Sequence, residues 1–241
     1  MEKKYSEEFA VPSHLVDGSR RLGTGNILHI LQELSYKGSE QLGCGDDEME
    51  RRGFAWIFSR IHIVIRRRPS IYEKVGLETW SKGLEGLFFN RHYRILDEKG
   101  EPLILGCGSC LVINLATRGL VRSDRIAPIA ETWEQNSEEA ASVPAKLVPC
   151  GEYDPVQLLS HKVMYSETDF VGHVNNSQYL RWAIDCEKSV DIDFNPADIT
   201  INFLKETKLG DTIEYYRCAS GETLNYCAKV GGTPVMLLEM K

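Results

Sequence analysis

The segment that decides the fold reads YSETDFVGHVNNSQYLRW and runs from Tyr165 to Trp182. It places a carboxylate at Asp169 and an imidazole at His173 just before residues whose apolar positions recur at helical spacing, namely Val174, Tyr179, Trp182 and Ile184. A helix N-terminus carries unpaired N–H groups and a partial positive charge, so it stabilises an oxygen that becomes negative during a reaction. We therefore expect Asp169 and His173 at the entrance to a helix that begins near Val174.

Each polar residue of this segment also has a purely structural interpretation. Asp and Asn are ordinary N-cap residues, so Asp169 or Asn175 would start the helix without taking part in any chemistry. Gly172 would only relieve a tight turn. His173 would be a turn histidine that is bonded to the backbone. The residues alone leave both interpretations open.

Composition is that of an ordinary globular protein. The chain has 241 residues, enough for one large core or for two small ones of roughly 100 residues each. A net charge of −7 argues against nucleic acid as the general partner. Residues 1–8 have no apolar core, and the apolar residues 103–116 are too few and too interrupted to span a bilayer. We expect a cytoplasmic protein that does not enter a membrane.

The cysteines do not indicate a metal site or a disulfide framework. There are seven of them, an odd number, and their spacing shows no two pairs of metal ligands. Cys107 and Cys110 form a single C-x-x-C inside a strand-like apolar run, which favours two buried thiols. We expect no disulfide, no metal and no cofactor.

The first half of the chain, residues 1–125, predicts one α+β unit. A strand over 5–11 leads to a helix that is capped by Thr24 and runs to about Leu42, where Ile27, Leu28, Ile30, Leu31 and Leu34 recur at helical spacing. The acidic residues 46–48 are expected to lie in a turn that closes this helix. Alternating or β-rich patterns then predict strands over 54–65, 75–80, 87–96 and 102–114.

The second half repeats this order after a change in composition. Residues 126–154 are rich in Glu and Ala and predict a linker with one short exposed helix. Residues 155–241 predict another unit, with a strand over 158–165, the helix after Val174 and a strand over 199–204. A shift of 138 residues (199 − 61) superposes the alternating pattern of 61–65 on that of 199–203, which indicates an internal duplication. We expect two sheets that form a pseudo-dimer around the apolar helices.

A family resemblance gives this architecture a name. Asp169-x-x-Gly172-His173-Val-Asn-Asn-x-x-Tyr179 resembles the active-site signature of hotdog thioesterases, the 4-hydroxybenzoyl-CoA thioesterase-like and acyl-ACP thioesterase families. Over residues 5–241 the chain looks like a bacterial acyl-ACP thioesterase, a family shared with plant plastids; its first half is similar over 31–33, 56–69 and 77–80. The resemblance implies two tandem hotdog units, each a long helix wrapped by an antiparallel sheet.

The resemblance also implies an activity. Members of the family hydrolyse the thioester of an acyl chain on the phosphopantetheine arm of acyl carrier protein, in fatty acid biosynthesis, and no cofactor is implied. Two alternatives stay open: an acyl-CoA thioesterase, and a sensor of the same fold that binds acyl thioesters without cleaving them. Because the chain holds both halves of the usual hotdog dimer, further assembly is optional, and a homodimer is the form we expect.

Four residues are implied as the site. Asp169 would attack the thioester or take a proton from the attacking water, and His173 would orient that carboxylate or water. Asn175 would hold the loop or the substrate. Glu206, which follows the strand over 199–204, would be a second base or a water-positioning group, although it would equally suit a solvated turn. The first half has no such motif at its helix entrance and would shape the acyl pocket.

Two positions depart from the family pattern, and the role of one arginine run stays open. The family has an asparagine where this chain has Val171, and it often has a cysteine where this chain has Thr207, so no thiol nucleophile is expected. The arginine run at 66–68 suits an exposed strand end better than a docking site for an acidic carrier protein, and the sequence leaves both open.

Overall fold

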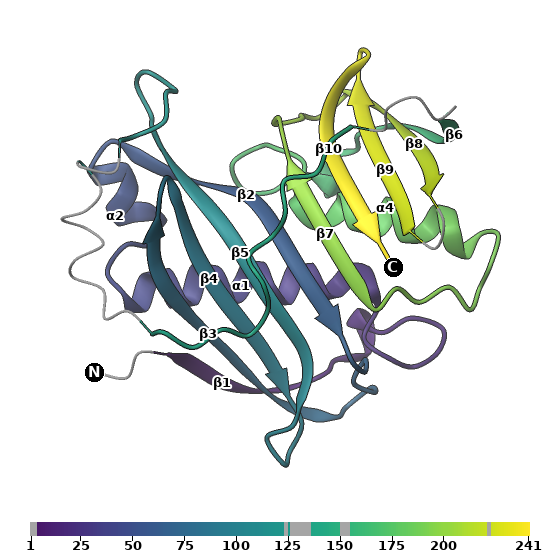
Figure 1. Ribbon diagram of the computed structural model, residues 1–241, viewed down its shortest axis with the longest axis horizontal. Helices are drawn as coiled ribbons and strands as arrows, with labels where there is room; N and C mark the ends of the chain where they lie inside the picture. The colour runs from purple at the N-terminus through teal and green to yellow at the C-terminus, as the bar shows by residue number, and fades with distance from the viewer. Residues whose placement is uncertain (1–3, 123–124, 126–135, 150–154, 221–222) are drawn as a thin grey trace.

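The computed structural model describes residues 4–122, 125, 136–149, 155–220 and 223–241. These residues hold an antiparallel sheet of ten strands (Figure 1). The strands are β1 (Tyr5–Ala10), β2 (Phe54–Ile65), β3 (Lys74–Glu85), β4 (Phe88–Leu96), β5 (Pro102–Asn114), β6 (Val156–Lys162), β7 (Asp198–Phe203), β8 (Thr212–Ser220), β9 (Thr223–Val230) and β10 (Thr233–Met240). Their order across the sheet is β1-β3-β4-β5-β2-β7-β10-β9-β8-β6.

The strand order is symmetric about the contact between β2 and β7. Read outward from that contact, β2-β5-β4-β3-β1 on one side matches β7-β10-β9-β8-β6 on the other. Ile61 pairs with Ile201 and Ile63 pairs with Ile199, so the segments that the 138-residue shift superposes lie antiparallel at the centre. The predicted α+β fold of two hotdog units is confirmed, while the limits 1–125, 126–154 and 155–241 stay a prediction.

The two units are joined more closely than we expected. Instead of two sheets, there is one continuous sheet, because the edge strands β2 and β7 satisfy each other's backbone hydrogen bonds. The apolar core is also continuous across both units. This union directs the ends of β5 and β7 toward the same end of the sheet, which matters for the site described below (Figure 1).

Two helices pack against one face of this sheet. They are α1 (Thr24–Gln41) and α4 (Asn176–Lys188), and their packing is tight enough that a Cβ atom at Gly25 would overlap Arg181. The predicted apolar faces are buried: Ile27, Leu28, Ile30, Leu31 and Leu34 in α1, and Tyr179, Leu180, Trp182, Ala183 and Ile184 in α4. Burying such a side chain contributes about 1.5–3 kcal/mol, so this contact with the sheet holds both helices.

Several local expectations differ from the structure. Thr24 is the first helical residue, and Gly23 is the N-cap. The expected turn over 46–48 is the start of a short helix, α2 (Asp46–Arg51), because acidic side chains stabilise a helix N-terminus. The expected strand over 158–165 ends at Lys162, and residues 165–167 form a 3-10 turn. Of these elements, α2 contributes to the wall of the cavity described below.

The linker forms a strap across the outer face of the sheet. Part of the expected exposed helix, 126–135, lies outside the described residues, and 136–149 is irregular backbone. The Trp80 indole donates to the carbonyl of Glu138 at 2.8 Å, and the Leu147 N–H donates to Oδ1 of Asn202 at 2.9 Å. The strap therefore fastens β3 of the first unit to β7 of the second.

The hydrogen bond between this strap and His92 depends on pH. Its Nδ1 accepts the N–H of Ala140 at 3.2 Å, so the bond requires the neutral imidazole. Burial, helped by the nearby Lys82 and opposed by Glu139 and Glu138, lowers the pKa of His92 to about 4. Because the ordinary value is near 6.5, the unfolded chain binds more protons between these values, and the free energy of unfolding falls as the pH falls through that window.

We expect acidification from pH 6.5 to 4 to remove about 2 kcal/mol through this group. In urea titrations, His92→Asn keeps an acceptor for the Ala140 N–H and cannot be protonated, so its stability should decline less than that of the wild type over the same range. An equal decline in both proteins would contradict this account of His92.

Cysteine chemistry departs from the expectation at one position. Cys44, Cys107, Cys110, Cys186 and Cys227 are free, but Cys218 is disulfide-bonded, so the expectation of no disulfide is wrong. Disulfides persist mainly in oxidising compartments, so this bond weighs against a cytoplasmic location. The location itself stays a prediction. No helix in the described part of the chain is long and apolar enough to cross a membrane.

Candidate active site

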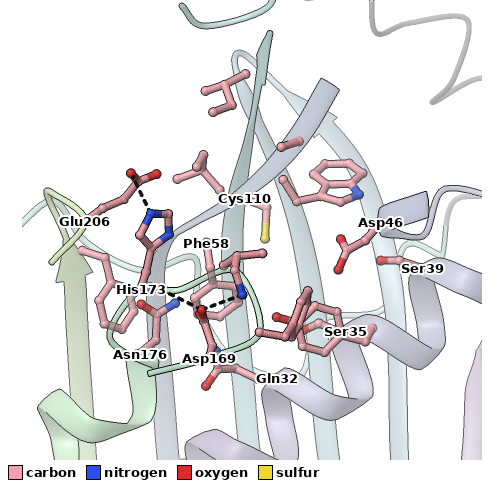
Figure 2. A pocket seen from close by; sticks show the side chains of 18 of the residues that line it. Gln32, Ser35, Ser39, Asp46, Phe58, Cys110, Asp169, His173, Asn176 and Glu206 are labelled. Atoms are coloured by element: carbon pink, nitrogen blue, oxygen red, sulfur yellow. Dashed lines mark hydrogen bonds and ion pairs between the residues drawn. The ribbon is translucent and has the colours of Figure 1, made fainter. Parts of the chain in front are cut away.

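A cavity of about 1100 Å³ opens between the two units. Helices α1 and α2 and strands β2, β4 and β5 supply its walls from the first unit (Figure 2). Residues 169–179 and 203–208 close it from the second unit. Three of the four predicted site residues line it, namely Asp169, His173 and Glu206.

The Asp169 carboxylate both holds its loop and faces the cavity. Its Oδ1 accepts the backbone N–H groups of Val171 and His173, each at 3.1 Å (Figure 2). Gly172, at φ +80°, lets the chain turn back so that the Asp169 N–H reaches the carbonyl of His173 at 2.8 Å. No hydrogen bond within the described residues uses Oδ2 of Asp169. One oxygen is thus fixed by the backbone, and the other is free to meet a substrate or a water.

His173 pairs with Glu206 instead of with Asp169. Its Nε2 lies 3.3 Å from Oε2 of Glu206 (Figure 2). Arg118, from the turn after β5, donates Nη2 to both oxygens of Glu206, at 2.7 and 2.9 Å. Arg118 has φ +56°, an uncommon conformation for a residue with a side chain. Glu206 therefore joins the imidazole of one unit to a guanidinium of the other.

Asn175 does not reach the cavity. It is the N-cap of α4, and its Oδ1 accepts the N–H of Ser177 at 3.0 Å and the Ser177 hydroxyl at 2.7 Å. The neighbouring Asn176 lines the cavity. Asn175 is therefore the helix cap that the purely structural interpretation predicted. Asp169 lies six residues before this cap, so the alternative in which Asp169 is the N-cap is wrong.

Asn175→Ala should therefore lower stability with little effect on turnover. Losing an N-cap costs about 1 kcal/mol, which corresponds to a fall in Tm of about 2–4 °C in a chain of this size. Calorimetry should find this fall, and Asn175→Ser, which keeps a capping oxygen, should restore most of it. A large loss of kcat with an unchanged Tm would instead give Asn175 a role with the substrate.

The sequence predicted that the first unit shapes the acyl pocket, but it did not point to the residues that this unit contributes. Gln32, Ser35, Tyr36 and Ser39 of α1 all line the cavity, and their spacing forms a polar stripe beside the buried leucines. Burial, with the charges of Asp46 and Asp169, raises the pKa of Tyr36 to about 12. The stripe is a local signal that could have been recognised, whereas nothing near Arg118 in the sequence indicates its contact with Glu206.

The structure also shows the surroundings of Thr207 and of the arginine run at 66–68. Thr207, at the position where the family often has cysteine, is buried and its hydroxyl bonds that of Tyr179. In the arginine run at 66–68, Arg68 is buried and pairs with Asp17, while Arg67 pairs with Glu73 at 2.6 Å. The run is therefore mostly committed to internal ion pairs and is not a free basic patch.

A double-hotdog fold with a carboxylate and a histidine in a cavity between its units defines a thioesterase-like class. Sequence models of the "Acyl-ACP thioesterase N-terminal domain" and "Acyl-ACP thioesterase C-terminal domain" match residues 2–128 and 154–229. The chain belongs to the acyl-ACP thioesterase family.

Individual proteins agree with this assignment. Oleoyl-acyl carrier protein thioesterase 1 of Arabidopsis thaliana is 24% identical over 95% of this chain, which spans 66% of that relative's length. A crystal structure of an acyl-ACP thioesterase from Bacteroides thetaiotaomicron has a TM-score of 0.87 at 20% identity, covering 99% of this chain and 97% of the other. The 12:0-ACP thioesterase of Umbellularia californica has a TM-score of 0.85 at 20% identity, covering 100% and 97%. At these identities the structures show the fold alone.

Proposed function

We propose that this protein hydrolyses fatty acyl thioesters of acyl carrier protein and releases the free fatty acid and the carrier thiol. The observation that carries the proposal is that Asp169 and the His173–Glu206 pair lie in one cavity, beside an apolar wall. That wall is built by Phe54, Trp56, Ile57, Phe58, Phe89, Ile113 and Phe203. Such a wall suits an acyl chain, and the named relatives act on acyl-carrier substrates.

The chemistry needs an attack on the thioester carbonyl and donors for the resulting oxyanion. The free oxygen of Asp169 would attack the carbonyl itself or take a proton from an attacking water; the hydrogen bonds that fix its other oxygen support this role. The Asn176 amide, on the first residue of α4, is the donor that we assign to the oxyanion. A thiolate leaves readily, so no strong acid is required.

His173 and Glu206 would serve the water. Glu206 accepts from Arg118 and faces Nε2 of His173, which fixes the direction of the imidazole at the cavity wall. If Asp169 attacks first, this pair would deliver the water that hydrolyses the acyl-enzyme. If Asp169 is the general base, the pair would hold the water in place before attack. Both routes use the same arrangement of side chains.

The cavity mouth suits a large acidic partner. Lys205 and Lys208 line the cavity together with the exposed side chains of Phe170 and Leu204. Basic groups around an apolar contact would attract an acidic carrier protein and then bury a small apolar surface. Basic groups would also attract the phosphates of CoA, so it is the exposed apolar pair that supports the carrier protein over free CoA as the donor of the acyl chain.

A matched comparison of substrates tests the proposal. Purified protein is given the same acyl chain on carrier protein and on CoA, and kcat/KM is measured for each. We expect turnover of both with a clear preference for the carrier. A large preference for CoA would make the protein an acyl-CoA thioesterase, and tight binding of both thioesters without turnover would make it a sensor.

A further inference from the structure

One cation inside the cavity has no role in the chemistry above. Arg91 on β4 lines the cavity, yet its side chain is buried, with 8% of the residue exposed. Its Nη2 donates to the hydroxyl of Ser39 at 3.2 Å, and its Nη1 donates to that of Thr79 at 3.4 Å. A guanidinium has five N–H donors, so these two bonds leave donors for another group.

Arg91 lacks the partner that a buried arginine normally has. Within the described residues no ion pair includes it, and both of its bonds go to neutral hydroxyls. A buried charge without a counter-ion is costly, so a purely structural side chain at this position would be expected to have a carboxylate beside it.

The fold also makes room for this guanidinium. A Cβ atom at Gly38 would overlap Nη1 of Arg91, so the cation packs directly on the backbone of α1. Glycine in the interior of a helix is less favourable than alanine. Two unfavourable features, a glycine inside a helix and a buried cation without a counter-ion among the described residues, therefore lie in contact with each other beside the cavity.

The surrounding wall is polar and partly anionic. Ser39 and Asp46 project into the same cavity (Figure 2), and Asp47 and Glu50 also line it. Within the described residues Asp46 has no ion-pair partner, and burial, with the charges of Glu40 and Asp47, raises its pKa. An unsubstituted hydrocarbon chain would leave all of these groups without a partner.

We propose that this end of the cavity binds a hydroxyl group on the acyl chain, so that the substrates include hydroxyacyl thioesters. The hydroxyl oxygen accepts from the guanidinium of Arg91, and its proton is donated to Ser39 or Asp46. This inference rests on the proposed function and specifies its substrate. A terminal carboxylate fits less well, because the three acidic side chains outnumber the one arginine.

The test compares kcat/KM for different substrates within each variant. A loss of folded protein lowers all of these values equally and cancels in their ratio. Carrier thioesters of one chain length are prepared unsubstituted, with a hydroxyl at successive carbons, or with a terminal carboxylate. They are assayed with the wild type and with Arg91→Met. Arg94→Met is the matched control, since Arg94 lies on the same strand but pairs with Glu78 and Glu138 on the outer face.

For the wild type, kcat/KM should be at least about 10-fold higher for one hydroxylated isomer than for the unsubstituted chain, in line with a bond to a charged donor. Arg91→Met should abolish this preference while it still hydrolyses the unsubstituted chain, and Arg94→Met should keep the preference. No preference for any hydroxylated isomer, a stronger preference for the carboxylate, or an unchanged preference in Arg91→Met would overturn the proposal.

A binding measurement separates this inference from the proposed function. Calorimetry with the free hydroxy acid and the free unsubstituted acid uses the same three proteins. If no thioester is hydrolysed but the hydroxy acid binds about 10-fold more tightly, and only when Arg91 is present, then the proposed function fails and the hydroxyl site stands. Equal affinities for the two acids would reject the hydroxyl site.

Discussion

Asp169→Asn is expected to lower kcat for thioester hydrolysis by about 10²-fold or more. The amide keeps an oxygen that can accept from the N–H groups of Val171 and His173, so the loop should hold its shape. It loses the negative charge that a nucleophile or a general base requires. KM should change little, because the acyl chain and the carrier protein meet other surfaces.

The matched control is Asp211→Asn. Asp211 also accepts a backbone N–H in a turn of the second unit, that of Lys208 at 2.8 Å, but it does not line the cavity. This variant should keep near-normal kcat. If Asp169→Asn is folded and retains most of its activity, then Asp169 only supports its loop and the mechanism is wrong.

Replacing either member of the His173–Glu206 pair should lower kcat by about 10²-fold. Because the two side chains lie 3.3 Å apart and act on one water, His173→Gln combined with Glu206→Gln should be scarcely worse than either single change. Rates of the four proteins in a double-mutant cycle measure this coupling. Losses that simply multiply would show that the two residues act separately.

A second histidine–glutamate pair provides the control for that cycle. His161 lies 2.8 Å from Glu167, also in the second unit, but neither residue lines the cavity. His161→Gln should therefore leave kcat within about 3-fold of the wild type, well short of the loss expected for a group that transfers a proton. A loss as large as that of His173→Gln would show that the assay responds to general loosening of this unit.

Regular elements were predictable because their signals are local. The apolar spacing of α1 and α4 and the alternation in β2 and β7 lie within short stretches of sequence, and the repeat of this order indicated two units. That the two sheets would join into one depends on how two exposed strand edges meet. No residue in either strand specifies that contact by itself.

The site was predictable only in part for the same reason. Asp169 and His173 belong to one short motif, and Glu206 was placed by its position after a strand. Their partners come from distant segments: His173 faces Glu206, and Glu206 meets Arg118 across the join between the units. For Asn175 the motif left a helix cap and a contact with the substrate open, and the structure shows the cap.

Val171 explains how this chain departs from the family pattern without losing the geometry. The residue is 58% exposed, and its backbone N–H donates to Oδ1 of Asp169. Any residue at this position other than proline can supply that donor. The asparagine of the family motif is therefore not needed to hold the Asp169 carboxylate in this chain.

The most direct test of the proposed activity is a time course of both products from one acyl-carrier substrate. Free fatty acid and free carrier thiol are quantified with the wild type and with Asp169→Asn. Hydrolysis at this site predicts that the two products rise together in equal amounts with the wild type and about 10²-fold more slowly with the variant. No release by the wild type, or equal release by the variant, would contradict the account.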